Sequence, residues 1–313
     1  MAEPRPVIIT CAVTGAIHTP SMSPYLPVTA ADIVASAKEA AEAGAAVLHL
    51  HGRHEETGQP DQSVEAFRRI VKPLSAATNA VLNLTTGGSP YMTAAERVAP
   101  ARDLAPRLAS LNMGSMNLGL FPMLKRYSEF RNDWERTHLE NSHDLVFRNT
   151  YSDISHILKT CRENGTRFEF ECYDTSHLYN LAHFAESGAV EPPFFVQTVF
   201  GLMGGIGTHV DDITHMRRTA ERLFGADLVW SALGAGAHQM RIAATVAASG
   251  GHVRVGLEDS LWSGPGRMAK SNAEQVRQVK KILQRLGLRA ATPEEAAEIL
   301  ALSPTMFDKK GAM

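Results

Sequence analysis

Two histidines separated by one residue offer a metal-binding pair. The sequence His49-Leu50-His51 ends a short apolar run, and the alternation of a β-strand places both imidazoles on one face and Leu50 on the other. Neutral imidazole nitrogens are common zinc ligands. A pair of hydrogen-bonded core histidines is the alternative interpretation of the same pattern, so the choice depends on what else the chain brings to them.

Adjacent carboxylates end another apolar run. In the segment GHVRVGLEDS, Glu258 and Asp259 follow the run and Arg254 lies within it. Glu258 could complete a site of two histidines and one carboxylate, which leaves a coordination position open for a substrate carbonyl. Capping of the next helix by the acidic pair is the alternative. Arg254 is flanked by valines, and its charged fork requires a carboxylate or an anionic ligand.

Further polar groups end three other apolar runs. Hydroxyl and amide donors after two of them could hold an oxyanion or a carboxylate, although a plain turn is the more common meaning of such sequences. These donors are Thr85, Thr86, Gly87 and Gly88 after one run and Ser115 after the next. In the third run Glu169 and Glu171 alternate with aromatic residues and share one face. If that face is interior, they need partners such as Arg254 or the histidines.

The apolar runs themselves predict the fold. Eight short runs rich in Val, Ile, Leu and Phe alternate with segments of helical periodicity, which is typical of parallel strands buried on both faces. This repetition predicts a (β/α)₈ TIM barrel, in which catalytic groups lie at the carboxyl ends of the strands. The expected strands are Val7–Ala12, Ala46–His51, Val81–Thr85, Leu108–Met113, Arg167–Cys172, Pro193–Phe200, Leu228–Leu233 and His252–Gly256. The expected helices lie at about residues 30–43, 63–78, 93–104, 143–164, 175–188, 211–224, 236–249 and 271–287.

Two segments exceed a minimal barrel. Residues 114–142 form a long connection after the fourth strand, and loops of that length lie preferentially on the catalytic face. A capped helix is expected from Thr292 to Leu302, beyond the eighth unit, and it could contact a neighbouring subunit. We expect one TIM-barrel domain over residues 1–313, with a C-terminal extension from about 290 to 313.

Composition excludes several classes of protein. The chain has 31 Lys and Arg against 33 Asp and Glu, so it lacks the basic excess of a nucleic-acid-binding protein. No apolar stretch reaches the length of a membrane-spanning helix, and we expect no membrane partner. Three cysteines without CxxC spacing indicate a reducing compartment, which favours a cytoplasmic location.

Taken in order, the strand ends resemble the β-keto acid cleavage enzyme family, and the resemblance spans nearly the whole chain. It is carried by ITCAVTGA at 9–16, AGAAVLHLHGR at 43–53, TGG at 86–88, LNMGSMN at 111–117 and GGHVRVGLED at 250–259. The resemblance implies a TIM barrel and a transferase that converts a β-keto acid and acetyl-CoA into acetoacetate and an acyl-CoA. It also implies a homo-oligomer, with a tetramer as the expected size.

The resemblance also implies roles for individual residues. One zinc ion would be bound by His49, His51 and Glu258. Arg254 and Asp259 match the family residues at the proton transfer that forms an enolate. Because arginine is a poor base, we assign the pair jointly. The catalytic residues expected here are Arg254, Asp259 and Thr85, the last standing where the family's representative has a serine.

One position departs from the family pattern. The representative, which acts on 3-keto-5-aminohexanoate, carries a glutamate where this chain has Ile17. Ile17 cannot pair with an ammonium group, and the neighbouring His18 would favour an uncharged or acidic tail. Glu169 or Glu171 taking over the glutamate's role is the competing possibility. The residues expected to bind substrate are Ile17, His18, Thr86, Gly87, Gly88, Ser115 and Glu169.

Two other functions remain open at this point. A zinc-dependent TIM-barrel hydrolase also uses an HxH pair, but on its first strand and with a downstream lysine, whereas here the pair lies on the second strand. A non-catalytic barrel that binds a small molecule would lack a metal ligand or the arginine, and this sequence lacks neither.

Overall fold

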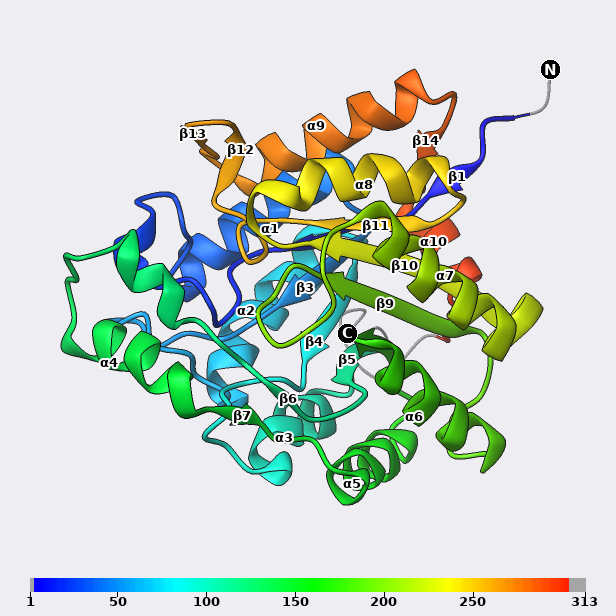
Figure 1. Ribbon diagram of the computed structural model, residues 1–313, viewed down its shortest axis with the longest axis horizontal. Helices are drawn as coiled ribbons and strands as arrows, with labels where there is room; N and C mark the ends of the chain where they lie inside the picture. The colour runs from blue at the N-terminus through cyan, green and yellow to red at the C-terminus, as the bar shows by residue number, and fades with distance from the viewer. Residues whose placement is uncertain (1–2, 304–313) are drawn as a thin grey trace.

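The computed structural model describes residues 3–303 and confirms the predicted barrel. Eight parallel strands close in the order β10-β11-β2-β3-β4-β5-β8-β9, and helices surround them (Figure 1). The strands are β2 (Ile9–Ala12), β3 (Val47–Leu50), β4 (Val81–Thr85), β5 (Leu108–Asn112), β8 (Arg167–Cys172), β9 (Phe194–Phe200), β10 (Leu228–Gly234) and β11 (His252–Val255). The surrounding helices are α1 (Ala30–Ala43), α2 (Val64–Ala77), α3 (Ala94–Leu104), α5 (Tyr151–Arg162), α6 (Thr175–Glu186), α7 (Val210–Phe224), α8 (Gln239–Ala248) and α9 (Asn272–Arg285).

Hydroxyl side chains define where many of these helices begin. In each case the hydroxyl accepts a hydrogen bond from a backbone N–H of the first turn, which would otherwise lack a partner. These N-cap residues are Thr29, Ser63, Thr93, Thr150 and Ser271. Gly44 caps the carboxyl end of helix α1, and its φ of 121° suits glycine. Local chemistry therefore explains why most predicted helix boundaries lie within a few residues of the observed ones.

Some predicted boundaries are wrong. The helix expected from residue 143 begins at Tyr151, because β7 (Val146–Phe147) pairs with β6 (Met116–Asn117) in an antiparallel ribbon. The helix expected from residue 236 starts with a short 3₁₀ turn, Gly236–His238, before α8. The first expected strand is divided, because β1 (Pro6–Val7) pairs with β14 (Arg289–Ala290) outside the barrel.

The long connection after β5 contains a helix that the sequence pattern did not predict, α4 (Asp133–Asn141), preceded by the 3₁₀ turn Phe121–Lys125. Trp134 of α4 donates from Nε1 to the carbonyl of Thr57 at 3.0 Å. The carboxylate of Glu135 accepts both the backbone N–H and the hydroxyl of Ser21, each at 2.9 Å. These bonds attach α4 to the loops that follow β3 and β2, so the connection covers the carboxyl end of the barrel.

The terminal helix α10 (Pro293–Ile299) lies at the opposite end of the barrel from α4 (Figure 1). Its buried Ala296 and the following Leu300 and Leu302 pack with the first interior layer of the strands. That layer consists of Ile8, Val47, Val81, Leu108 and Phe195. The apolar side chains of this segment are therefore covered by the chain's own barrel, and its contact with a neighbouring subunit stays a prediction. Part of the predicted extension, residues 304–313, lies outside the described residues.

Two further expectations from the sequence concern membranes and assembly. Among residues 3–303, no helix combines the length and apolar character that crossing a bilayer requires. The homo-oligomer expected from the sequence stays a prediction.

The packing of α10 predicts a stability effect. Leu300 is only 2% exposed, and replacing it with alanine would leave a cavity against the lower end of the barrel. We expect Leu300→Ala to lower the free energy of unfolding by about 2–5 kcal/mol, as measured by urea denaturation. Glu298→Ala, on the exposed face of the same helix, should change it by less than about 0.5 kcal/mol. Equal effects of the two variants would contradict the packing role.

Candidate functional site

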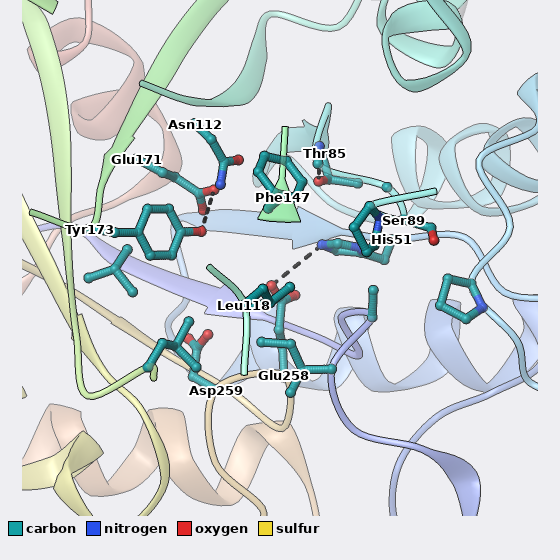
Figure 2. Close-up of a pocket in the computed structure, with 18 of the residues that line it drawn as sticks. His51, Thr85, Ser89, Asn112, Leu118, Phe147, Glu171, Tyr173, Glu258 and Asp259 are labelled. Carbon is teal, nitrogen blue, oxygen red and sulfur yellow. Dashed lines mark hydrogen bonds and ion pairs between the residues drawn. The ribbon is translucent and has the colours of Figure 1, made fainter. Parts of the chain in front are cut away.

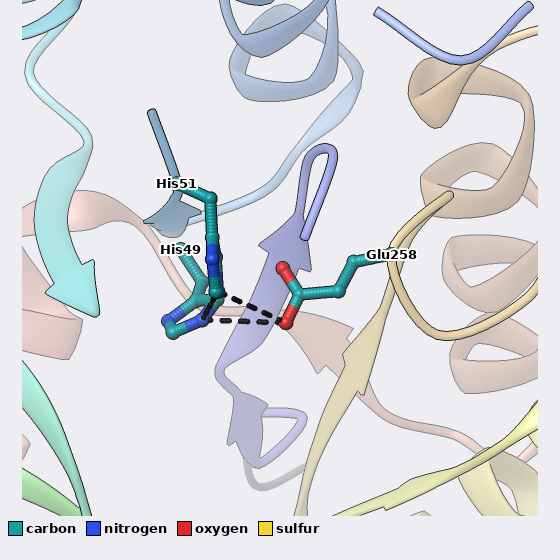
Figure 3. A group of neighbouring side chains, drawn as sticks. All are labelled: His49, His51 and Glu258. Atoms are coloured by element: carbon teal, nitrogen blue, oxygen red, sulfur yellow. Dashed lines mark hydrogen bonds and ion pairs between the residues drawn. The ribbon is translucent and has the colours of Figure 1, made fainter. Parts of the chain in front are cut away.

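His49, His51 and Glu258 converge at the carboxyl end of the barrel. The Nε2 atoms of the two histidines lie 3.2 Å apart, and each lies 3.4 Å from Oε1 of Glu258. Figure 3 shows both imidazoles turned toward the carboxylate. All three side chains are buried. The structure thus brings together the three residues that the sequence suggested as metal ligands.

The turn after β11 holds Glu258 in this position. The backbone N–H of Leu257 donates to Oδ1 of Asn272 at 2.8 Å, and that of Gly256 donates to Oε1 of Gln239 at 3.0 Å. Gly15, from the loop after β2, lies against the side chain of Glu258 with a φ of 65°, and a Cβ at this position would overlap Cγ of Glu258. Only glycine fits this contact without displacing the carboxylate.

The spacing of the three groups fits a metal ion. A tetrahedral ion with bonds of about 2.0–2.1 Å separates its ligand atoms by about 3.3 Å, close to the distances found here. Oε2 of Glu258 and Nδ1 of His49 are buried without a hydrogen-bond partner among the described residues. Burial opposes ionisation of Glu258, but the His51 and His49 imidazoles and Arg254 outweigh it and hold the pKa of this carboxyl well below its usual range. The donor set is therefore one that suits zinc.

Arg254 lies at the centre of a cluster of four carboxylates. Its Nε and Nη2 donate to the two carboxylate oxygens of Asp259 at 3.0 and 2.9 Å. Nη2 also donates to Oε1 of Glu258 at 2.6 Å, and Nη1 donates to Glu171 at 2.8 Å and to Glu169 at 3.5 Å. The sequence predicted that the two glutamates of β8 would need such a partner, and Arg254 is that partner.

The charges of this cluster do not balance within the protein. Four buried carboxylates face one guanidinium, so full ionisation would leave three uncompensated negative charges. Burial raises the pKa of Asp259 to about 6 and that of Glu169 to about 7, despite the attraction of Arg254. The next buried arginine, Arg53, donates only to neutral oxygens of Thr14, His18 and Gly58. The mouth of the barrel therefore favours an additional cation and a proton.

A cavity opens above these groups. Its polar lining includes Thr85, Glu171, Arg254, Asp259 and the three potential metal ligands. Ile17, Gly87 and Gly88 also line it, as expected of substrate-binding residues, and Oγ1 of Thr85 accepts the backbone N–H of Gly87 at 2.9 Å. In Figure 2 His51 and Glu258 face one another, while Glu171 and Tyr173 enter from another wall.

Four of the expected substrate-binding residues do not line this cavity. The hydroxyl of Thr86 donates to the carbonyl of Ser110 at 2.7 Å, and that of Ser115 accepts the N–H of Asn149 at 2.8 Å. His18 is buried, with Nδ1 3.0 Å from the carbonyl oxygen of Leu257, and burial lowers its pKa to about 4. The fourth, Glu169, is fully buried and accepts a bond from the amide of Asn83. These residues support the site without facing its cavity.

Several cavity residues were not singled out as site residues from the sequence. Tyr173 donates from its hydroxyl to Glu171 at 3.3 Å, and Asn112 lies beside it in Figure 2. Asn112 lies in the last part of the predicted strand Leu108–Met113, and Tyr173 directly follows the predicted strand Arg167–Cys172, so their positions could have suggested them. Val199 and Leu233 come from the barrel strands β9 and β10. The others come from the loops, helix α4 and strand β7 outside the barrel strands and give no such signal; they are Ala16, Pro60, Ser89, Pro90, Leu118, Leu120, His138, Phe147 and Leu202.

A TIM barrel with a three-ligand cluster beside a buried arginine–carboxylate network has the architecture of a barrel enzyme. The chain matches the beta-keto acid cleavage enzyme family over residues 6–302, and it belongs to that family. It is therefore an enzyme that cleaves β-keto acids at a carbon–carbon bond, with acyl-transfer chemistry.

Individual relatives agree with this assignment. The chain is 60% identical over 302 residues to a 3,5-dioxohexanoate:acetyl-CoA acetone transferase from Paraburkholderia graminis, covering 96% of this chain and 97% of that protein. It is 34% identical to a 3-keto-5-aminohexanoate cleavage enzyme from Acetoanaerobium sticklandii, covering 95% and 98%. A solved complex of ObcA with oxaloacetate superposes with a TM-score of 0.71 at 19% identity over 90% of this chain and 68% of that one, a likeness of fold.

The contact between Gly15 and Glu258 predicts a difference between two glycine variants. Gly15 and Gly266 have nearly equal φ values of 65° and 68°, but a Cβ at Gly266 would meet nothing within 4 Å. Both alanine variants incur backbone strain, and only Gly15→Ala also displaces Glu258. We expect Gly15→Ala to lower the free energy of unfolding by about 1–3 kcal/mol more than Gly266→Ala. Equal losses in urea denaturation would contradict the contact.

Proposed function

We propose that this enzyme converts a β-keto acid with an uncharged tail and acetyl-CoA into acetoacetate and an acyl-CoA. C2 loses a proton and bonds to the acetyl carbon as the acetyl–sulfur bond breaks and releases coenzyme A. The thiolate of coenzyme A then takes the acyl fragment at C3 as the C2–C3 bond breaks, and the proton returns to C2 of the acetoacetate. The observation that carries the proposal is the triangle of His49, His51 and Glu258, open to the same cavity as Asp259. Family membership and the acetyl-CoA-dependent relative support the reaction class.

We propose zinc as the metal of this triangle. Two imidazoles and one carboxylate favour zinc over magnesium, which prefers oxygen ligands. When bound, zinc would supply Lewis-acid polarisation of the 3-keto oxygen, which acidifies C2.

Asp259 is the proposed acceptor of the C2 proton. It lines the cavity, and two N–H groups of Arg254 fix the plane of its carboxylate. Arg254 itself stays protonated, because the surrounding carboxylates, Asp259 foremost, overcome the effect of burial and raise its pKa well above the usual value. The roles that the resemblance gave to this pair jointly thus divide in our proposal. Asp259 accepts the proton, and Arg254 orients the carboxylate of Asp259.

Thr85 is a candidate for binding the substrate carboxylate. Its oxygen accepts the N–H of Gly87, which leaves the hydroxyl proton free to donate into the cavity. Gly87 and Gly88 line the same wall, so the substrate can approach the backbone closely.

An uncharged tail suits the rest of the cavity. Ile17, Leu118, Leu120 and Phe147 provide apolar lining. Glu171, which could have replaced the missing glutamate, has both carboxylate oxygens engaged, one by Arg254 and the other by the hydroxyl of Tyr173. The relative with 60% identity is named for 3,5-dioxohexanoate, which has such an uncharged tail. With this substrate, the products would be acetoacetate and acetoacetyl-CoA.

The alternative functions have less support. No lysine lines the described cavity, and the histidine pair lies on the second barrel strand, so the hydrolase pattern is incomplete. A binding-only barrel would have no need for the full set of ligands and the arginine.

The separation of metal binding from proton transfer is testable by three variants. We expect the purified enzyme to hold one zinc per chain, and His49→Ala to lose both zinc and turnover. Asp259→Asn should keep zinc and lose turnover by about 10²–10⁴-fold, because only the proton acceptor changes. His156→Ala, on the exposed face of α5, should keep both. Full zinc occupancy in His49→Ala, or normal turnover in Asp259→Asn, would contradict these roles, as measured by metal analysis and steady-state kinetics.

Substrate charge provides the second test of the proposal. We expect kcat/KM for 3,5-dioxohexanoate to exceed that for 3-keto-5-aminohexanoate by at least about 100-fold, because an ammonium group against the apolar part of the lining loses its hydration without gaining a partner. Chromatography of the CoA esters formed from each acid measures both rates. A preference for the cationic acid would overturn the assignment of an uncharged tail.

A further inference from the structure

One polar atom of the cavity has no partner in the site described so far. His138 lines the cavity from helix α4, and its Nε2 is buried without a hydrogen-bond partner among the described residues. A buried imidazole nitrogen without a partner is costly, because it has lost water and gained nothing in return. Because His138 also lines the cavity, a bound ligand is one source of that partner.

The imidazole of His138 is held in a defined place. Its ring meets the indole of Trp134 edge-on, with centroids 5.9 Å apart. Trp134 and Glu135 attach α4 to the loops after β3 and β2, and the adjacent Leu139 is fully buried. A group fixed in this way can distinguish ligands, since it loses little conformational freedom on binding.

The surroundings of His138 define what it can recognise. Burial, with the charge of Arg53 as a further cause, lowers the pKa of His138, so the ring is neutral at neutral pH. The same cavity has apolar lining residues, which include Ile17, Leu118, Leu120 and Phe147. A neutral imidazole in a cavity with this apolar lining suits a ligand with an uncharged oxygen in an otherwise apolar tail.

We propose that His138 determines tail specificity by donating a hydrogen bond from Nε2–H to the second keto oxygen of a 3,5-diketo acid. This inference rests on the proposed function and identifies a residue that recognises the tail of the substrate. It also explains how the enzyme can select a substrate with a polar tail although position 17 is an isoleucine and carries no charge.

Two substrates that differ only in that oxygen test the proposal. They are 3,5-dioxohexanoate and 3-oxohexanoate, each assayed with acetyl-CoA and the wild-type enzyme, His138→Leu or His138→Gln. The measured quantity is the ratio of kcat/KM for the diketo acid to that for the monoketo acid. We expect His138→Leu to lower this ratio by about 10–100-fold, the effect of one lost hydrogen bond to a buried group. His138→Gln, which keeps an N–H donor, should retain most of it.

The controls separate this inference from general damage. His143→Leu changes an exposed histidine of the same connection that lies outside the cavity, and it should keep the wild-type ratio. An unchanged ratio in His138→Leu would overturn the role of His138 while leaving the proposed function intact. If the wild-type enzyme turns over neither acid, both the function and the inference are wrong.

A structural measurement covers the case in which His138→Leu does not fold. A crystal structure of the wild-type enzyme with 3,5-dioxohexanoate should place the 5-oxo oxygen within about 3.2 Å of Nε2 of His138. An oxygen that points away from His138 would overturn the proposal.

Discussion

The attraction between one buried guanidinium and four buried carboxylates is the constraint on which the mouth of this barrel depends. Arg254 donates to acids from two strand ends, and each bond fixes a carboxylate that would otherwise repel its neighbours. Because one positive charge cannot offset four negative ones, the cluster is balanced only by a proton and a further cation. The histidine pair beside Glu258 provides the ligands with which a divalent cation would complete that balance.

The rest of the fold serves to keep this cluster in place and away from bulk water. Asn272 and Gln239 hold the turn that carries Glu258, and Gly15 leaves room for its side chain. At one end α10 closes the barrel with apolar side chains, and at the other α4 and its loops cover the cavity. Electrostatic interactions are stronger in a site that excludes water than in bulk water. The segments that cover the cavity therefore strengthen the interactions among the charged groups proposed to act in catalysis.

The sequence predicted the parts of the molecule that depend on local pattern. Apolar runs predicted the strands, and His49, His51 and Glu258 came from the polar ends of those runs. It did not predict α4, because that helix is mostly polar and is positioned by bonds to Ser21 and Thr57, far away in the chain. His138 was missed for the same reason. The sequence also could not tell which of the neighbours Thr85 and Thr86 faces the cavity, since that depends on the end of β4.

The central claim is that a metal ion at His49, His51 and Glu258 completes the charge balance around Arg254. Anomalous diffraction from crystals of the purified enzyme, recorded on both sides of the zinc absorption edge, tests it directly. The account predicts one anomalous peak about 2.0–2.2 Å from Nε2 of both histidines and from a carboxylate oxygen of Glu258. Crystals of active enzyme with no anomalous peak for any metal between these three residues would contradict it.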